Sequence, residues 1–322
     1  MSARRLIFGP YSRQPRRDKR KPGVLRRLYR QRRRLAVLFA ALTYAVWTRE
    51  GGLDGMRYAL KHELHGNLTI FAVSMGLALA IVTLGAGIVV SYLAPGMRRG
   101  VEGFAIACVL SDQLLRLDTP VTNMIPDGLG AWFVFMVLYV CIVALLDSSL
   151  LYRLGLRLPL SLRASRTLDA RPETIWGHVA SDDGTMSADQ RQYVKRVEPR
   201  PDIGPETFEV HYKMVRGVTL AQIHTRTAWD APAHLKYSFA PADHARMGGT
   251  SNGTYEMTCT AREDGRTDVT ITQHYPGLGP GAWLTMWLDD AGRDEMDSIQ
   301  ARVEGRRDWS TLGRSMRVVA QA

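Results

Sequence analysis

The sequence predicts a transmembrane helical N-terminal half followed by an α+β domain. Three observations carry this prediction. The segment from Leu68 to Ala94 contains no Asp, Glu, Lys, Arg or His, and at about 1.5 Å of rise per residue it exceeds a hydrocarbon core of roughly 30 Å. A second apolar segment, Leu129 to Leu151, is interrupted only by Asp147. From Pro159 the composition becomes that of a soluble domain, with strand-like alternation ahead of a helical pattern.

The N-terminal arm, residues 1–34, holds the excess positive charge. It contains fourteen Arg or Lys residues against Asp18 alone, a net charge of +13, so the rest of the +11 chain carries −2. Each cation beside a membrane helix is attracted to anionic headgroups by on the order of 1 kcal/mol. We expect membrane lipids, and no nucleic acid, as its partner; a solvated arm that only sets topology is the alternative. The expected membrane-surface residues are Arg26, Arg27, Arg30, Arg32, Arg33, Arg34 and Trp47.

Residues 35–158 form the predicted membrane region. The apolar part at 35–47 is short for a span and predicts an interfacial helix, with a third span as the alternative. The segments 68–94 and 129–151 are the predicted transmembrane helices. Small residues on one face of the first predict a helix-packing surface. They are Gly76, Ala80, Thr83, Gly87 and Ser91.

Orientation follows from the basic residues that flank the two spans. Lys and Arg are more frequent before the first span and after the second than in the loop between them. By the positive-inside rule, both termini lie in the cytoplasm, as in a multi-pass protein of a bacterial inner membrane.

The cysteines and the histidine-rich segment indicate no metal or disulfide site. Cys108, Cys141 and Cys259 have no CxxC spacing. His62 and His65 lie three apart on a potential helix, but no further ligands are evident nearby. We therefore expect no metal.

The C-terminal domain is predicted over residues 159–307, with a tail at 308–322. A first strand lies near 162–168, and Pro172 suits the first turn of the helix after it. The sequence SADQ at 187–190 fits a capping box that starts a second short helix.

Alternating apolar residues then predict five further strands. They lie at 208–212, 223–229, 235–239, 255–259 and 269–275. Turn residues from Glu263 to Arg266 connect the last two strands as a hairpin. The pattern from Gly281 to Arg306 predicts one long terminal helix whose inward stripe includes Gly292 and Met296.

Two passages of this domain resemble a known superfamily. LDARPETIWGHVA at 168–180 and GTSNGTYEMTCTAREDGRTDVTITQHY at 249–275 are similar to START-like domains, also called the SRPBCC or polyketide-cyclase-like superfamily. The resemblance covers about half of the chain. It implies a helix-grip fold, in which a curved antiparallel sheet wraps a long C-terminal helix and encloses a cavity for an apolar ligand. A lipid, sterol, quinone or polyketide would suit such a cavity, and no other cofactor is implied.

The predicted ligand-binding residues are inward strand positions and residues of the terminal helix. Gly292 is expected to leave room where that helix crosses the sheet, and the tryptophans at the helix start to rim the cavity. The set is Tyr212, Ile223, Tyr237, Phe239, Tyr255, Met257, Trp283, Trp287, Gly292 and Met296. A core filled by the same side chains is the alternative.

Catalysis is not expected from these residues. His211, His224 and His274 alternate out of phase with the apolar positions, so we expect them to face away from the interior. The sequence also lacks a nucleophile–base spacing and a phosphate-binding glycine loop. It predicts a membrane-anchored module that binds an apolar, lipid-like molecule. The alternative is an accessory or assembly subunit of a membrane complex that uses the domain as an interaction scaffold. A cyclase- or aromatase-type enzyme would need a polar group inside the cavity.

Overall fold

The protein divides into two compact units in a computed structural model. The structure describes residues 31–49, 98–115, 129–148, 150–180, 194–213, 219–242 and 252–313, together with positions 29, 81 and 85. Described residues within Pro159–Gly277 and Asp290–Ala322 belong to the sheet unit. Those within Val24–Leu158 and Leu278–Asp289 belong to the helical unit.

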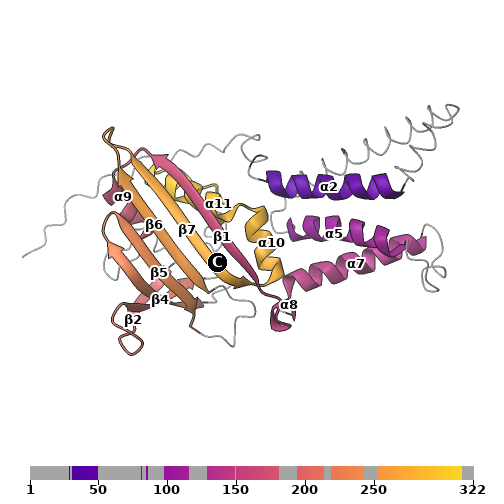
Figure 1. Cartoon of the computed structure of the whole chain (residues 1–322), viewed down its shortest axis with the longest axis horizontal. Coiled ribbons are helices and arrows are strands. Elements are labelled where there is room, and N and C mark those ends of the chain that lie inside the picture. The colour runs from indigo at the N-terminus through magenta and orange to yellow at the C-terminus, as the bar shows by residue number, and fades with distance from the viewer. Residues whose placement is uncertain are drawn as a thin grey trace, which may run out of the picture. The chain divides into compact units, whose positions relative to one another are not determined.

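A seven-stranded sheet forms the sheet unit, in the order β1-β7-β6-β5-β4-β3-β2 (Figure 1). All pairs from β2–β3 through β6–β7 are antiparallel. The strands are β1 Leu158–Leu168, β2 Val194–Pro199, β3 Thr207–Lys213, β4 Thr219–Asp230, β5 His234–Pro241, β6 Gly253–Ala261 and β7 Thr267–Leu278.

Two helices, α9 (Pro172–Val179) and α11 (Ala291–Val303), cover one face of this sheet (Figure 1). Their apolar residues share a core with the strands, because alternate strand positions turn toward the helices. Ile175 of α9, Met257 of β6, and Met296 and Ile299 of α11 are all fully buried there. The curved antiparallel sheet with its helices agrees with the helix-grip architecture that the resemblance implied.

Several local predictions in this unit are confirmed. Helix α9 begins at Pro172, which occupies its first turn. The hairpin between β6 and β7 turns at Gly265, whose φ of +79° is in the left-handed region that favours glycine. The capping-box segment at 187–190 lies outside the described residues.

The predicted long terminal helix is divided into two. Helix α10 covers Pro280–Leu288 and α11 begins at Ala291. Between them Asp290 has φ 52° and ψ 55°, a left-handed conformation that ends a right-handed helix. The apolar periodicity runs through this junction and so gave no sign of the break. Strand β2 was also missed, because half of its sequence VKRVEP is charged and it shows no regular alternation of apolar residues.

The helical unit contains α2 (Arg32–Arg49), α5 (Arg98–Leu115), α7 (Leu129–Asp147), α8 (Leu150–Arg153) and α10. The predicted interfacial helix at 35–47 lies in α2, including Trp47 in its last turn, and α7 covers most of the predicted second span. Among the described helices, none is both long enough and apolar enough to cross a membrane. The predicted span at 68–94 and its packing residues lie outside the described residues, apart from positions 81 and 85.

Two arginines predicted at the membrane surface instead join helices of this unit. Arg34 is only 2% exposed; its Nη2 donates to Glu102 Oε1 at 2.6 Å and its Nη1 to Asp289 Oδ1 at 2.9 Å. Arg33 Nη1 donates to the carbonyl oxygen of Trp287 at 2.7 Å. A buried guanidinium requires acidic partners, and α5 and the end of α10 supply them. Arg26, Arg27 and Arg30 lie outside the described residues.

Candidate functional site: a pocket on the helix-covered face

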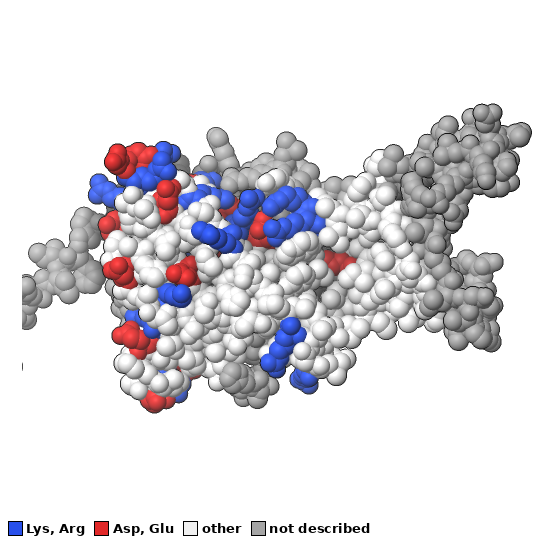
Figure 2. Space-filling model, viewed as in Figure 1, with Lys and Arg blue, Asp and Glu red and all other residues white. Residues whose placement is uncertain are grey.

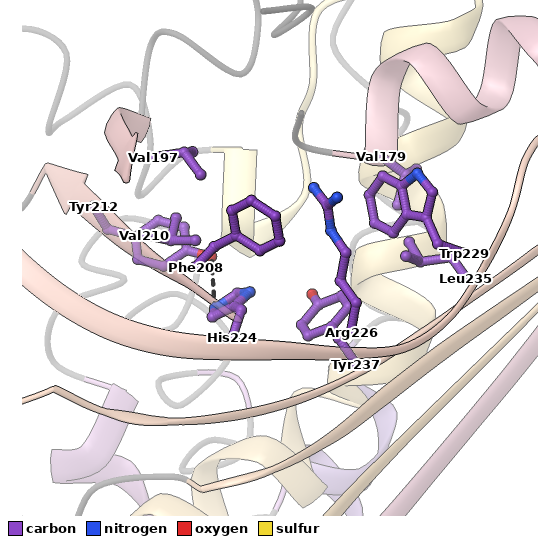
Figure 3. Close-up of a pocket in the computed structure, with 10 residues that line it drawn as sticks. All are labelled: Val179, Val197, Phe208, Val210, Tyr212, His224, Arg226, Trp229, Leu235 and Tyr237. Carbon is purple, nitrogen blue, oxygen red and sulfur yellow. Dashed lines mark hydrogen bonds between the residues drawn. The ribbon is translucent and has the colours of Figure 1, made fainter. Parts of the chain in front are cut away.

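A pocket lies between the β2–β5 side of the sheet and the end of α9 (Figure 3). Its volume is about 40 Å³. A water molecule needs roughly 10–15 Å³ on this measure, so the pocket has room for about three. The lining residues are Val179, Val197, Phe208, Val210, Tyr212, His224, Arg226, Trp229, Leu235 and Tyr237.

A β-bulge in β4 decides which side chains enter this pocket. The register between β4 and β5 shifts between Arg226 and Ala228. The extra residue reverses the alternation, so His224 and Arg226 share a face with Trp229 although their sequence parity differs. The prediction that His224 faces outward and Ile223 inward was therefore wrong. It assumed strict alternation along the whole strand.

His224 is held among aromatic side chains in the pocket. Its ring stacks on Tyr237, with centroids 4.7 Å apart and an interplanar angle of 14°. Nε2 donates to Gln222 Oε1 at 3.2 Å and lies 3.4 Å from the Tyr212 hydroxyl, as drawn in Figure 3. Burial, and secondly the positive charge of Arg226, lowers the pKa of His224 from its ordinary value of 6.5 to about 4. The imidazole is therefore neutral at physiological pH.

Arg226 extends between two aromatic rings. Its Cζ atom lies 4.0 Å from the centroid of Phe208 and 3.7 Å from that of Trp229. Trp229 in turn meets Trp176 of α9 edge-on, at 5.3 Å between centroids. Figure 3 shows the guanidinium end of Arg226 between these rings, pointing away from the strand backbone. Cation–π contacts thus hold a positive charge in an otherwise aromatic and aliphatic pocket.

The predicted ligand-binding residues are only partly brought together. Tyr212 and Tyr237 line the pocket. Phe239, Tyr255, Met257 and Met296 belong to the packed core beside it. The filled-core alternative therefore holds for these four side chains.

The other predicted residues lie elsewhere. Gly292 packs against β1, where a Cβ would lie 3.4 Å from Leu162 Cβ, so it permits close helix–strand contact and leaves no room for a ligand. Trp283 and Trp287 belong to the helical unit and stack on each other with centroids 6.0 Å apart. They do not rim this pocket.

Two further histidines lie outside the pocket. His274 is exposed, as predicted, and its Nδ1 lies 2.9 Å from Ser161 Oγ. His211 alternates with the pocket residues Val210 and Tyr212 and so faces away from the pocket, but it is only 7% exposed, with its Nε2 3.2 Å from Glu209 Oε1. In the part of the chain that the structure describes, no three His, Cys, Asp or Glu side chains gather to hold a metal ion.

A second polar cluster lies deeper, between α11 and the β6–β7 strands. Gln273 Nε2 donates to Glu295 Oε2, and the Tyr275 hydroxyl donates to Gln273 Oε1 at 3.3 Å. Burial raises the pKa of Glu295 above its ordinary value of 4.5, and burial with the neighbouring Glu295 raises that of Tyr255. The interior is therefore less apolar than the alternation of the strands predicted.

Comparison with known proteins identifies the type of domain. Residues 159–304 match the model of the family described as polyketide cyclase / dehydrase and lipid transport. Together with the sheet and its helices, this match makes residues 159–304 a START-like polyketide cyclase/dehydrase domain. Domains of this type typically bind hydrophobic ligands. No curated protein matches the chain.

Solved structures are similar to this domain at low identity. A protein from Chromobacterium violaceum is 15% identical and covers 45% of this chain and 96% of its own, with a TM-score of 0.33. A START superfamily protein from Mycobacterium smegmatis is 11% identical, covering 45% of this chain and 97% of its own, with a TM-score of 0.31. At these scores the likeness adds no argument of its own. The assignment of the domain therefore depends on the family match and the observed sheet.

Proposed function

We propose that the START-like domain binds an apolar, lipid-like ligand, such as a lipid or quinone, at a membrane surface to which the N-terminal half anchors it. The observation that carries this proposal is the pocket itself. Nine of its ten lining residues are aliphatic, aromatic or a neutral histidine, and Arg226 is the one charged group among them. Sites for apolar ligands are lined in this way, with few polar groups to fix orientation.

The size of the pocket limits how the ligand is held. Ligand pockets usually enclose several hundred Å³, whereas this one measures about 40 Å³. With the side chains in their present positions it accommodates one end of a lipid-like molecule. A longer occupant requires lining side chains to move.

Binding is a better account of this pocket than catalysis. A histidine acts well as a general base when its pKa lies near the working pH, and the pKa of His224 is about 4. The ten lining side chains include no carboxylate, thiol or serine hydroxyl as a nucleophile. A cyclase-type enzyme would have the polar group it needs in His224, but only as a weak base at neutral pH.

The surface of helix α7 supports the membrane part of the proposal. Phe133, Met136, Val137 and Val140 recur at helical spacing and are 71%, 44%, 45% and 59% exposed. On the face drawn in Figure 2, the described helices α2, α5 and α7 are almost without charged residues. An exposed apolar stripe of this kind fits lipid. It equally fits another membrane protein, which is the observation behind the second candidate function, an accessory or assembly subunit of a larger complex.

The ligand is tested by native mass spectrometry and solvent extraction of the purified full-length protein. We expect a co-purifying apolar compound that is lost in Val197→Trp, which fills the pocket from β2. Ile223→Trp, on the opposite face of β4, is the matched control and should keep the compound. A wild-type protein that neither carries nor binds any apolar compound would refute the binding function.

Purification of the full-length protein in mild detergent distinguishes the two roles of the α7 face, as a lipid anchor or as a docking surface for other proteins. A docking subunit remains with other proteins in mild detergent, and a simple anchor is recovered alone and associates with liposomes in flotation. Recovery as a monomer under all mild conditions would exclude the accessory-subunit role.

A further inference from the structure

We infer that residues 150–157, which follow α7, bind anionic phospholipid headgroups and hold the helical unit at the bilayer surface. This segment, with the sequence LLYRLGLR, is called the α8 turn below. The inference rests on the membrane part of the proposed function. It adds the segment and the class of lipid through which the helical unit is held, and it does not involve the pocket of the sheet unit.

The α8 turn has a defined backbone. Gly155, just past α8, has a φ of +88°, in the left-handed region that favours glycine. The amide of Leu156 donates to the Leu151 carbonyl oxygen at 3.0 Å, and that of Gly155 donates to the Tyr152 carbonyl oxygen at 3.1 Å. These are the two hydrogen bonds of a Schellman motif. A Cβ on Gly279, which precedes α10, would lie 3.5 Å from Tyr152 Cβ, so the turn also packs against its own unit.

This ordered turn exposes three leucines. Leu150, Leu154 and Leu156 are 49%, 72% and 48% exposed. They follow the exposed stripe of α7, which contains no charged side chain from Phe133 to Leu145. Exposed apolar surface of this extent marks a contact with a membrane or a protein. The exposed residues of the stripe are Phe133, Met136, Val137, Val140, Cys141, Ala144 and Leu145.

Two arginines among the leucines favour a bilayer over a protein. Arg153 and Arg157 are exposed, and residues 150–158 contain no acid. In the part of the chain that the structure describes, neither arginine forms an ion pair; Arg157 lies over the Tyr152 ring, 4.9 Å from its centroid. An apolar protein interface would bury both cations without acidic partners, which costs free energy. At a bilayer the leucines enter the acyl boundary while the guanidinium groups remain among the phosphates.

The charge of the arginines determines the class of lipid. A cation beside an anionic surface gains on the order of 1 kcal/mol, which is about a fivefold gain in partitioning for each arginine. A zwitterionic headgroup carries its own cation and so gives less. The sequence assigned this contact to Arg33 and Arg34, but both bind groups within the helical unit. Arg153 and Arg157 are the exposed cations that remain beside the α7 stripe.

Photolabelling of the full-length protein tests the inference. One set of vesicles is phosphatidylcholine alone, and the other is an equal mixture of phosphatidylcholine and phosphatidylglycerol. Both contain a trace of a phospholipid with a diazirine in its acyl chain, and peptide mapping by mass spectrometry locates the label. We expect labelling of residues 150–157 to be about fivefold stronger or more in the vesicles that contain phosphatidylglycerol.

Paired substitutions separate the α8 turn from the rest of the charge. Arg153→Gln with Arg157→Gln should lose the lipid preference at residues 150–157. Arg153→Lys with Arg157→Lys should keep it, because the charge is retained. The matched control, Arg262→Gln with Arg266→Gln, removes two exposed arginines from the β6–β7 hairpin and should be labelled as the wild type is. The basic arm at residues 1–34 is unchanged in all of these proteins.

The possible failures are distinguishable. Equal labelling of residues 150–157 in the two vesicle types, or a preference that survives in Arg153→Gln with Arg157→Gln, overturns the inference. Labelling of α7 without residues 150–157 also overturns it. In each of these cases the proposed anchoring by the N-terminal half stands. If no part of the helical unit is labelled in either vesicle type, the membrane part of the proposed function fails and the inference fails with it.

The test does not depend on the folding of a variant. Circular dichroism checks the fold of each substituted protein. If Arg153→Gln with Arg157→Gln does not fold, the comparison of the two vesicle types with the wild type still decides, because equal labelling there refutes the inference.

Discussion

His224 and Glu295 are ionisable groups inside the sheet unit, and burial acts on them in opposite directions. Removal from water disfavours the charged form of each, which lowers the pKa of the histidine and raises that of the acid. Both side chains are therefore held closer to neutrality than they would be in an unfolded chain. Their effects on stability consequently have opposite dependences on pH.

His224 should make the domain less stable in acid. Its pKa is about 4 in the folded state against 6.5 normally, so between these values the unfolded state binds more protons. Stability therefore rises with pH across this window, by roughly 2 to 3 kcal/mol in total. In His224→Gln we expect a melting temperature that depends less on pH between 4 and 6.5.

The substitution His224→Gln leaves unchanged the residues that face His224. They are Tyr212 on β3, Arg226 on β4 and Tyr237 on β5. The exposed His274 provides the control, and His274→Gln should melt with the pH profile of the wild type. Parallel profiles for His224→Gln and the wild type would show that the burial of His224 has no effect on stability.

Glu295 should have the opposite effect. Its folded pKa is raised above 4.5, so above that pH the folded state binds more protons than the unfolded state. Its contribution to stability therefore falls as the pH rises from 4.5 through the folded pKa. We expect Glu295→Gln to melt at a higher temperature than the wild type at pH 8, with the difference shrinking toward pH 4.5. Glu304→Gln, at the end of the same helix, is the control and should not show this trend. A difference in melting temperature between Glu295→Gln and the wild type that does not change with pH would contradict this explanation.

Among the elements, α10 is held by contacts with two other helices of its unit, α2 and α7. Arg33 and Arg34 of α2 bind the Trp287 carbonyl oxygen and Asp289 at its C-terminal end. At its N-terminal end, a Cβ on Gly281 would overlap the backbone carbonyl of Leu146 in α7. Because Arg34 also binds Glu102, the helices α2, α5 and α10 share one buried ion-pair cluster.

Removing only the cation from this cluster should lower the free energy of unfolding more than removing both Arg34 and Glu102. Arg34→Ala removes the cation that pairs with the buried Glu102, which is 4% exposed, and we expect a loss of about 3–5 kcal/mol. The double substitution Arg34→Met with Glu102→Met replaces both ions with apolar side chains and should be less destabilised than the single variant. Urea unfolding of the full-length protein followed by circular dichroism measures both. A double variant as unstable as Arg34→Ala would mean that the acid is not the source of the loss.

The sequence predicted most strands of the sheet but not the pocket, for a physical reason. Alternation identifies a strand wherever one face is buried, and β3, β5, β6 and β7 follow it. A bulge leaves no signature in such a pattern, so the β4 side chains before it were assigned to the wrong face. Phe208, Val210, Trp229 and Leu235 were placed on apolar strand faces, but His224 and Arg226 needed the register of β4 against β5.

At the level of the whole molecule, the family match and the compact units do not coincide. The match covers residues 159–304, whereas Leu278–Asp289, including α10, belongs with the helical unit. After the change near Pro159 the composition stays that of a soluble domain, and for that reason it could not reveal a later return to the first unit. The chain therefore leaves the helical unit, re-enters it at α10 and returns to the sheet unit at α11.

A fragment of residues 159–322 should accordingly contain an unsupported α10. Without α2, α5 and α7, the residues of α10 that meet Arg33, Arg34 and Leu146 are exposed. We expect limited proteolysis to cleave the fragment within 278–289 faster than the full-length chain, while the strands are cleaved at similar rates in both. Equal protection of 278–289 in the two proteins would refute this dependence.

The return of α10 to the helical unit also sets an order on biosynthesis. The ribosome releases α2, α5 and α7 long before residues 280–288, because all seven strands lie between them in the chain. These helices can therefore contact α10 only after the strands have been translated. Until then Arg34 and Glu102 have each other but not Asp289. The helices α2, α5 and α10 therefore complete their ion-pair cluster only after the strands of the sheet have been translated.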